Sequence, residues 1–282
     1  MYRDSKKVLL IGGEGFIGRN ISDVISGRFD CYSLGIKKSL FPERKDVYIN
    51  GDPYVDYVGK EFDVYIHLID NMVEPDIFTE KEKSLLEHVG MKKGKHLILF
   101  SSAVVYVNPE SSYGIRKVLL EKIYEEYCKE HGINLTILRL FNIYGKYQLP
   151  YRQGSLIANI LYNYLNDTPI EINDMQARRD FMYAGDMGKV VLWVIENKFF
   201  GKMDLATGKL ISVKDLLRAL SDSVFLKKME VVNKNIKENN LCPLGDAKLF
   251  SNITPVSLSE GLNDALSFYK KHDRVIKKYF NI

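Results

Sequence analysis

Cysteine is scarce in this sequence: the 282 residues include three, Cys31, Cys128 and Cys242. Their number is odd, they lie far apart and no two have CxxC spacing, so we expect neither a disulfide framework nor a metal site. Such sparse use of cysteine is typical of a reducing compartment. We therefore expect a cytoplasmic protein.

Long apolar runs are missing as well. No run approaches the roughly 18 to 20 residues that span a bilayer, and Val190–Ile195 is among the longest. The apolar stretch Val8–Ile11 is far too short for the core of a signal peptide and runs straight into glycines. We therefore expect no membrane partner.

A strong excess of one charge is also absent. The 40 basic and 36 acidic residues leave a formal net charge of +4, and the basic residues form only short clusters such as Lys92-Lys93. Because a nucleic-acid-binding face needs denser basic clustering, nucleic acid is not an expected partner. What the chain does contain, 46% hydrophobic and 27% charged residues, is typical of a globular protein with one large core or two joined ones.

The first half of the sequence alternates short β-like runs with amphipathic stretches. This pattern predicts βαβ units and an α/β fold with a Rossmann-type doubly wound parallel sheet. The expected strands are Lys7–Ile11, Asp30–Leu34, Val47–Ile49, Val64–Leu68, His96–Phe100 and Leu135–Leu140. The expected helices are about Phe16–Ser26, Ile77–Val89 and Tyr113–Glu130.

The pattern becomes less regular after about Tyr147, which indicates a smaller C-terminal lobe. Helices are expected at Asp186–Glu196 and Ser257–Lys271, and Ser212 begins another, with Asp215 three residues on as a capping box. We predict a dinucleotide-binding domain over residues 1–168, with 185–205 packing back on it. Residues 169–282 are then the substrate-binding lobe.

Glycines cluster where the first expected strand turns into the first expected helix. Gly12 permits a tight turn, Gly15 lets backbone amides approach a pyrophosphate, and Gly18 lets the helix pack closely on the sheet. The N-terminus of this helix, at Phe16 and Ile17, then faces the phosphate charge. A plain glycine-rich turn is the alternative, but the strand before it and the helix after it favour a dinucleotide site.

The second expected strand ends in Leu34-Gly35 and is followed by Lys37 and Lys38, without the carboxylate that usually binds the adenosine ribose of NAD. Loss of that acid removes repulsion against a 2′-phosphate, and either lysine, helped by Arg19, can pair with one. This favours NADP(H). NAD(H) is the alternative if both lysines are merely solvated. Asp52, after the third strand, is a candidate acceptor for the adenine amino group.

Tyr113 and Lys117 stand four residues apart on an expected helix and so share one face. Alone, such a pair is usually an exposed helix face, but Ser102 precedes it at the end of an expected strand, at the sheet edge where ligands bind. A nearby ammonium favours the phenolate form of tyrosine, so Tyr113 can exchange a proton with a sugar hydroxyl as hydride moves at the adjacent carbon. Lys117 would also hold the nicotinamide ribose, and Ser102 would hydrogen-bond the reacting oxygen.

With these features the chain resembles the extended short-chain dehydrogenase/reductase family, specifically its nucleotide-sugar epimerases, dehydratases and reductases. The matching motifs run nearly end to end: the glycine loop, Tyr65–Leu68 (YIHL), Phe100–Tyr106 (FSSAVVY), Tyr113–Lys117 (YGIRK), Leu138–Gly145 (LRLFNIYG), Arg179–Met187 (RDFMYAGDM) and Thr254–Leu262 (TPVSLSEGL). The resemblance implies that Ser102, Tyr113 and Lys117 are catalytic and that Asn142 and Arg179 hold the substrate diphosphate. A salt bridge from Arg179 to Asp180 is the alternative. A homodimer and carbohydrate biosynthesis are implied by the same analogy.

Three departures from the family pattern bear on the activity. Ala103 and Val104 stand where dehydratases of the family carry an acidic pair, so 4,6-dehydration is disfavoured. The segment Leu68-Ile69-Asp70-Asn71, which the resemblance places near the cofactor, replaces small alanines. No second arginine occurs in the stretch 239–243 before the last helix.

These features predict an NAD(P)-dependent enzyme that transfers hydride at a ring carbon, expected to be C4, of a nucleotide sugar. The missing ribose acid slightly favours a 4-keto reductase, and a 4-epimerase that retains NAD is the alternative. A non-catalytic, cofactor-sensing protein on the same fold is the alternative of another class.

Overall fold

The computed structural model describes residues 6–56, 59–70, 72–152, 155–223, 229–237, 245–248 and 252–280. The chain divides into two compact units, Met1–Leu140 with Met187–Asp204, and Phe141–Asp186 with Leu205–Ile282. This division falls earlier than the boundary predicted at residue 168. The physical reason is that β7 (Asn142–Tyr144) leaves the large sheet and pairs in parallel with β10 (Phe181–Tyr183), a strand of the second unit.

The first unit is built on a seven-stranded sheet in the order β11-β6-β5-β4-β1-β2-β3. Its pairs β3/β2, β2/β1, β1/β4, β4/β5 and β5/β6 are all parallel. The strands are β1 (Lys7–Ile11), β2 (Asp30–Gly35), β3 (Val47–Asn50), β4 (Val64–His67), β5 (His96–Ser102), β6 (Asn134–Leu140) and β11 (Gly201–Leu205). The predicted fold class and the six predicted strands are confirmed.

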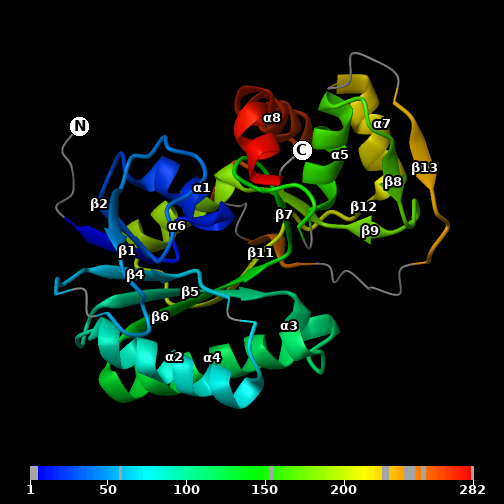
Figure 1. Ribbon diagram of the computed structural model, residues 1–282. Helices are drawn as coiled ribbons and strands as arrows, with labels where there is room; N and C mark the ends of the chain where they lie inside the picture. The colour runs from blue at the N-terminus through cyan, green and yellow to red at the C-terminus, as the bar shows by residue number, and fades with distance from the viewer. Residues whose placement is uncertain are drawn as a thin grey trace. The chain divides into compact units, whose positions relative to one another are not determined.

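Helices cover both faces of this sheet (Figure 1). On one face lie α2 (Pro75–Val89) and α4 (Ser112–His131), and on the other lie α1 (Phe16–Ile25) and α6 (Gly185–Glu196). A methyl group on Gly188 of α6 would lie 2.5 Å from Cβ of Val24 in α1, so this glycine permits close packing of the two helices. A short helix, α3 (Val104–Val107), follows β5.

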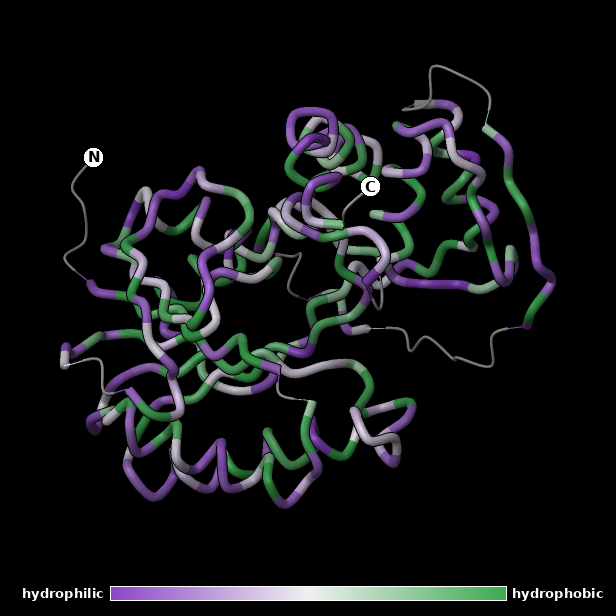
Figure 2. Tube along the Cα trace, viewed as in Figure 1, coloured by the Kyte–Doolittle hydropathy of each residue, from purple (hydrophilic) through white to green (hydrophobic). Residues whose placement is uncertain are grey.

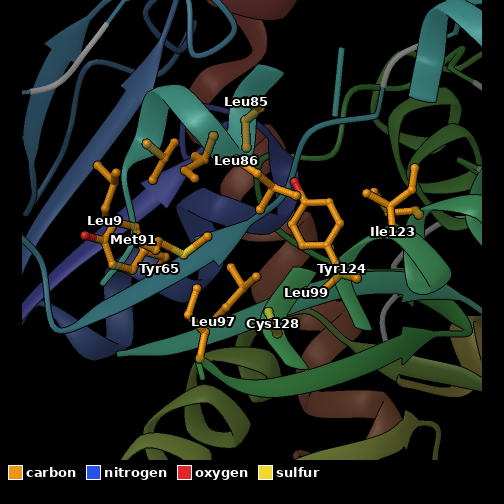
Figure 3. Packing of buried hydrophobic residues seen from close by; sticks show 14 of the residues in the cluster. Leu9, Tyr65, Leu85, Leu86, Met91, Leu97, Leu99, Ile123, Tyr124 and Cys128 are labelled. Atoms are coloured by element: carbon orange, nitrogen blue, oxygen red, sulfur yellow. The ribbon is translucent and has the colours of Figure 1, made fainter. Parts of the chain in front are cut away.

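The main core of the first unit lies between the sheet and the pair α2 and α4. Leu9, Leu97 and Leu99 of the sheet are fully buried, as are Leu85 and Leu86 of α2. Figure 3 shows Tyr124 and Cys128 of α4 and Met91 packing into the same cluster. Hydrophobic residues concentrate along the central strands, whereas the outer turns of α2 and α4 are hydrophilic (Figure 2). This layer forms because the strands are apolar along their whole length, whereas the helices are apolar on one side.

The second unit combines helices with two-stranded sheets. Its elements are β7, β10, α5 (Leu156–Leu165), β8 (Ile170–Ile172), β9 (Arg178–Arg179), β12 (Ile211–Ser212), α7 (Val213–Ser223), β13 (Val231–Asn233) and α8 (Leu258–Phe280). Strand β8 pairs with β13 in parallel, and β9 pairs with β12 antiparallel. The sequence did not predict α5 or any of these short strands. The last helix was predicted, but it extends to Phe280.

The ends of two helices follow the serine signals in the sequence. Ser212 Oγ accepts a hydrogen bond from the backbone N–H of Asp215 (3.0 Å) and donates one to its carboxylate (2.6 Å). Ser257 and Glu260 form a reciprocal box in which each side chain accepts from the other's backbone N–H, at 3.0 and 3.3 Å. Both arrangements satisfy amides that a helix leaves unpaired. The predicted start at Ser212 is confirmed.

Within the described ranges, no helix has the length and apolar character needed to cross a bilayer. In the same ranges, no group of three or more histidine, cysteine, aspartate and glutamate side chains is arranged to hold a metal ion. Cys242 and the rest of the stretch 239–243 lie outside the described residues.

Candidate active site

The glycine loop joins β1 to α1. Gly12 has a φ of +83°, which favours glycine, and its N–H donates to Leu34 O at 2.8 Å, so the loop turns sharply against the end of β2. Helix α1 begins at Phe16 after Gly15, which has no side chain to cap it. The first amides of a helix have no partner within the helix. This end of α1 therefore has the donors and the partial positive charge that suit a pyrophosphate.

The glycines of the loop differ in what keeps them small. A methyl group on Gly18 would lie 2.5 Å from Gly13 Cα, and one on Gly13 would lie 2.3 Å from Ser33 Oγ, so both positions are fixed by packing within the protein. A methyl group on Gly15 would meet nothing closer than Gly12 O at 3.6 Å. Nothing inside the described chain requires glycine there, so the position leaves room for a molecule that approaches the first amides of α1.

Acidic and basic side chains gather beside the end of β2. Glu14, in the glycine loop, accepts hydrogen bonds from Ser39 N at 2.7 Å and from Arg44 at 2.5 Å. Its Cγ would lie 3.7 Å from a methyl group on Gly35, the last residue of β2. A carboxylate therefore does lie next to this strand end, although it comes from another segment and is paired with an arginine.

The residues predicted to bind the adenosine end differ in burial and in their contacts. Lys37 and Lys38 are exposed just beyond β2, as a role in binding a 2′-phosphate requires. The idea that Arg19 helps them is wrong, because its side chain is 1% exposed and its NH1 lies 3.5 Å from the buried carboxylate of Asp46. Asp52 lies in the turn after β3, where its Oδ1 accepts from Tyr54 N at 3.0 Å. Its role with adenine stays a prediction.

Ser102, Tyr113 and Lys117 come from β5 and α4. Ser102 is the last residue of β5, and its Oγ accepts a hydrogen bond from Val104 N at 3.2 Å, which leaves its proton for another acceptor. Tyr113 is half-buried in the first turn of α4. The ammonium of Lys117 lies 5.5 Å from the centre of the Tyr113 ring, so the two residues share one helix face as their spacing predicts.

The N-terminus of α4 is positioned tightly. Ser111 caps the helix by accepting from Gly114 N at 3.0 Å. A methyl group on Gly114 would lie 2.1 Å from Asn108 O, so the chain that leads into the helix packs directly on its first turn. Glycine after Tyr113 is therefore a packing requirement, and it fixes where the tyrosine lies.

A charged network ties α4 to the end of β5. Glu121, one turn beyond Lys117, accepts from Ser101 Oγ at 2.7 Å, from Arg139 at 2.6 Å and 2.9 Å, and from Lys202 at 3.2 Å. Burial alone raises the pKa of Glu121, but these donors outweigh it and hold the pKa below its ordinary value. The carboxylate therefore stays charged and fixes α4 relative to the strand that carries Ser102.

The end of β4 holds a buried contact between a histidine and a carboxylate that the sequence did not predict. His67 and Glu82 are both fully buried, with Nε2 and Oε2 3.0 Å apart. The hydroxyls of Tyr124 and Tyr54 also donate to Glu82, at 2.9 and 3.2 Å. Burial raises the pKa of Glu82, but His67 and the two phenols together keep it below its usual range. Histidine in the YIHL motif thus has a structural partner on α2.

The second unit contains a cavity of about 480 Å³, within the range of small-molecule sites. Both predicted diphosphate ligands, Asn142 and Arg179, line it. Arg152 lines it as well, although it lies far along the chain from the stretch 239–243, where a second arginine was expected. The other lining residues are Ile143, Tyr144, Gln148, Ser155, Leu156, Ile157, Asn159, Glu171, Ile172, Asn173, Asp174, Phe181 and Val213.

Asp180 anchors the segment next to Arg179 through buried hydrogen bonds. Its carboxylate is fully buried and accepts three hydrogen bonds, from Thr207 N and Oγ1 at 2.8 and 2.6 Å and from Gly208 N at 2.8 Å. Asp180 thus binds the turn after β11.

The sheet, the glycine loop and the uncapped end of α1 define a Rossmann-type dinucleotide-binding protein. Residues 87–204 match the family model described as NAD dependent epimerase/dehydratase family. This match confirms the resemblance to the extended short-chain dehydrogenase/reductase family that the motifs predict.

Known relatives include both epimerases and reductases. The chain is 25% identical to a putative UDP-glucose 4-epimerase of Methanocaldococcus jannaschii, over 95% of this chain and 99% of that protein. It is 25% identical to a UDP-2-acetamido-2,6-beta-L-arabino-hexul-4-ose reductase of Pseudomonas aeruginosa, over 71% of this chain and 52% of that protein. Among solved structures, the UDP-glucose 4-epimerase of Thermus thermophilus in complex with NAD matches with a TM-score of 0.77 at 19% identity, covering 94% of this chain and 99% of that one.

Proposed function

We propose that the protein is an NAD(P)-dependent enzyme that transfers hydride at a ring carbon, C4, of a nucleotide sugar, with Tyr113 as its acid and base. The observation that carries this proposal is the ammonium of Lys117 beside the ring of Tyr113 on the capped first turns of α4. A serine hydroxyl with a free proton at the end of β5 completes the set. The similarity to the NAD dependent epimerase/dehydratase family supports a bound dinucleotide beside these residues.

The residues present fit a dinucleotide. Gly15 leaves open space beside the first amides of α1, so Phe16, Ile17 and Gly18 would hold the pyrophosphate through backbone N–H groups. When bound, the nicotinamide supplies or accepts the hydride at the sugar carbon. Lys117 would hold the nicotinamide ribose through its ammonium.

The proton that accompanies the hydride passes through Tyr113. In the reductive direction Tyr113 gives its phenolic proton to the carbonyl oxygen of a keto sugar, so the ketone becomes a secondary alcohol, and water reprotonates the phenolate. In the oxidative direction the phenolate takes the hydroxyl proton. Ser102 donates to the same oxygen and orients it, while the positive charge of Lys117 stabilises the phenolate.

The nucleotide part of the substrate is assigned to the cavity of the second unit. Arg152 and Arg179 both line it, and a guanidinium presents paired donors that match phosphate oxygens. Asn142 adds an amide donor at the same wall. A nucleoside diphosphate is the ligand whose charge and size these residues suit.

NADP(H) is the cofactor that we favour. Lys37 and Lys38 are exposed beyond β2, and Arg44 compensates the charge of Glu14 at the same strand end, so a 2′-phosphate would meet positive charge there. With exchangeable NADP(H), the outcome is reduction of a 4-keto nucleotide sugar. A 4-epimerase with retained NAD is the second candidate, and the similarity to the Methanocaldococcus protein over nearly the whole chain favours it.

One experiment tests the catalytic role and a second one separates the two outcomes. Tyr113→Phe should lower turnover at least about 100-fold while cofactor still binds. Tyr127→Phe is the matched control, since it removes a hydroxyl from the same helix, and it should keep most of the activity. Unchanged turnover in Tyr113→Phe would overturn the acid/base role and leave a cofactor-sensing protein.

The second experiment identifies the cofactor that stays bound through purification by mass spectrometry, and then offers NADPH and NADH with 4-keto nucleotide sugars. Consumption of NADPH in proportion to product supports the reductase. Retained NAD with no net consumption supports the epimerase. Replacement of both Lys37 and Lys38 by alanine should weaken NADPH binding and leave NADH binding unchanged. Location in the cytoplasm and a homodimer stay predictions.

A further inference from the structure

Asp70 lies beside the ammonium of Lys117. Its Oδ1 is 3.4 Å from Lys117 Nζ, and the Lys117 side chain is only 6% exposed, whereas that of Asp70 is 42% exposed. A carboxylate at this distance from a largely buried ammonium forms an ion pair with it. Asp70 also belongs to the segment 68–71 that replaces the small alanines of the family.

The segment that carries Asp70 packs directly on the glycine loop. Leu68 N donates to Ile11 O at 2.9 Å, which extends the contact between β4 and β1 beyond His67. A methyl group on Gly12 would lie 3.0 Å from Ile69 Cγ1 and 3.4 Å from Ile69 N. Asp70 is therefore held between the loop assigned to the pyrophosphate and the lysine assigned to the nicotinamide ribose.

The surroundings of Asp70 are acidic. The pKa of Tyr54 is strongly raised, first by burial and then by the negative charges of Glu82, Asp52 and Asp70. A dinucleotide that enters beside this group brings two negative charges on its pyrophosphate, and more with a 2′-phosphate. Lys117 is a cation that faces the dinucleotide, and the carboxylate of Asp70 offsets part of its positive charge.

We infer that Asp70 is a positioning residue that shares the Lys117 ammonium with the nicotinamide ribose and thereby weakens the binding of the dinucleotide and speeds its release. The inference rests on the proposed role of Lys117 in binding the cofactor. An ammonium has three donors, so it can serve one carboxylate oxygen and two ribose hydroxyls together. This sharing weakens the binding of the dinucleotide, because the carboxylate of Asp70 stays near the negative charge of the ligand.

Two effects of removing Asp70 oppose each other, and their sizes decide the sign. Loss of the ion pair frees Lys117 to move, which would weaken binding. However, the lysine stem is almost completely buried and stays held by its own packing. Loss of the carboxylate leaves an uncompensated positive charge where an anion binds. We therefore expect Asp70→Asn to bind the dinucleotide more tightly, by about two- to fivefold at low salt, the range that a partly exposed ion pair supports.

The test measures dissociation constants of NADH and NADPH by titration calorimetry at pH 7.5, on protein stripped of cofactor. The variants are Asp70→Asn and, as a matched control with the same charge change, Asp76→Asn in the exposed first turn of α2. Asp70→Asn should bind more tightly than the wild type in 20 mM salt, and the gain should shrink in 0.5 M salt, at which the screening length falls to only about 4 Å. Asp76→Asn should show neither effect.

A double-mutant cycle asks whether Asp70 acts through Lys117. The gain from Asp70→Asn should be lost when Lys117 is replaced by methionine, which keeps the length of the stem without the charge. A gain of equal size in both backgrounds would overturn the inference, since Asp70 would then act on the cofactor directly. Unchanged binding in Asp70→Asn would overturn it as well.

The proposed function and this inference fail in different ways. Wild-type protein that binds neither dinucleotide would refute the proposed function. Wild-type protein that binds a dinucleotide and responds to Tyr113→Phe, but not to Asp70→Asn, would leave the function standing and refute only the role of Asp70.

Discussion

We predict that Gly15 is needed for ligand binding and Gly18 for packing. Substitution of each by alanine should distinguish the two roles. A methyl group on Gly18 would lie 2.5 Å from Gly13 Cα and O, whereas ordinary contact begins at about 3.4 Å, so α1 must shift by about 0.9 Å relative to the loop. Such overpacking costs roughly 1 to 3 kcal/mol, and the higher helix propensity of alanine returns about 1 kcal/mol. Gly18→Ala should therefore lower the free energy of unfolding by up to about 2 kcal/mol.

Gly15→Ala should behave in the opposite way. The added methyl meets only Gly12 O at 3.6 Å, and Gly15 precedes α1 with an extended conformation that alanine adopts easily, so stability should change by about 0.5 kcal/mol at most. The methyl would stand where the pyrophosphate approaches the first amides of the helix. Loss of one such charge-assisted hydrogen bond corresponds to about tenfold weaker binding or more.

Both variants are measured in the same two assays. Urea unfolding without cofactor gives stability, and calorimetric titration with NADPH and NADH gives affinity. The two variants should differ in opposite ways. Gly18→Ala should lose stability in urea unfolding, and Gly15→Ala should lose affinity for the dinucleotide in the titration. If Gly15→Ala bound dinucleotide as tightly as the wild type, the pyrophosphate would not lie at this helix end, and the assignment of the loop would be refuted.

Two further predictions concern stability against pH and substrate binding. Burial lowers the pKa of His96 to about 4, below its unfolded value near 6.5, so the stability that its neutral form contributes is complete above pH 6.5 and falls as the pH drops toward 4, with about 2 kcal/mol lost by pH 5. His96→Gln should therefore flatten the fall in unfolding free energy between pH 7.5 and 5, and a fall as steep as in the wild type would contradict this reasoning. Arg179→Lys should raise the KM for the nucleotide sugar about tenfold with a smaller change in kcat, because lysine lacks the paired donors of the guanidinium; an unchanged KM would show that the cavity wall at Arg179 does not bind the diphosphate.

The first unit was largely predictable from sequence because its strands are buried on both faces. Continuous apolar runs such as Val8–Ile11 and His96–Phe100, separated by amphipathic stretches, have few structural alternatives. All six predicted strands therefore appear. The glycine loop and the Tyr113 helix follow from motifs that need only local context.

The second unit was predictable only in its longer helices. Strands β9 and β12 are two residues long, and β8, β10 and β13 are three. Strands this short show no periodicity in the sequence. They form because a neighbouring segment of the chain supplies a hydrogen-bonding partner. The division of the chain after Leu140 was not predicted for the same reason, since nothing local shows that β7 pairs with β10.

The site residues divide in a similar way. Ser102, Tyr113 and Lys117 were predicted because their spacing along the chain is the signal. Arg152, the Glu14–Arg44 pair and the contact of Asp70 with Lys117 were not predicted, because each brings together segments that are distant in sequence. The absence of an acid at the end of β2 was read correctly along the chain, yet Glu14 reaches that strand end from the loop, 21 residues earlier than Gly35.

The proposed catalytic trio does not itself choose between reduction and epimerisation, because both begin with a proton and a hydride moving at the same sugar carbon. What separates them is whether the dinucleotide leaves after each turnover. The groups that we propose to set the residence time of the dinucleotide are therefore decisive: Lys37 and Lys38 at the adenosine end, and Asp70 beside Lys117 at the nicotinamide end. A carboxylate that weakens the hold of Lys117 suits an enzyme that exchanges its cofactor and would be a disadvantage to one that keeps it. On this argument, Asp70→Asn should slow cofactor release and shift rate limitation toward that step, while substitution of Ser102 should slow the chemical step and leave release unchanged.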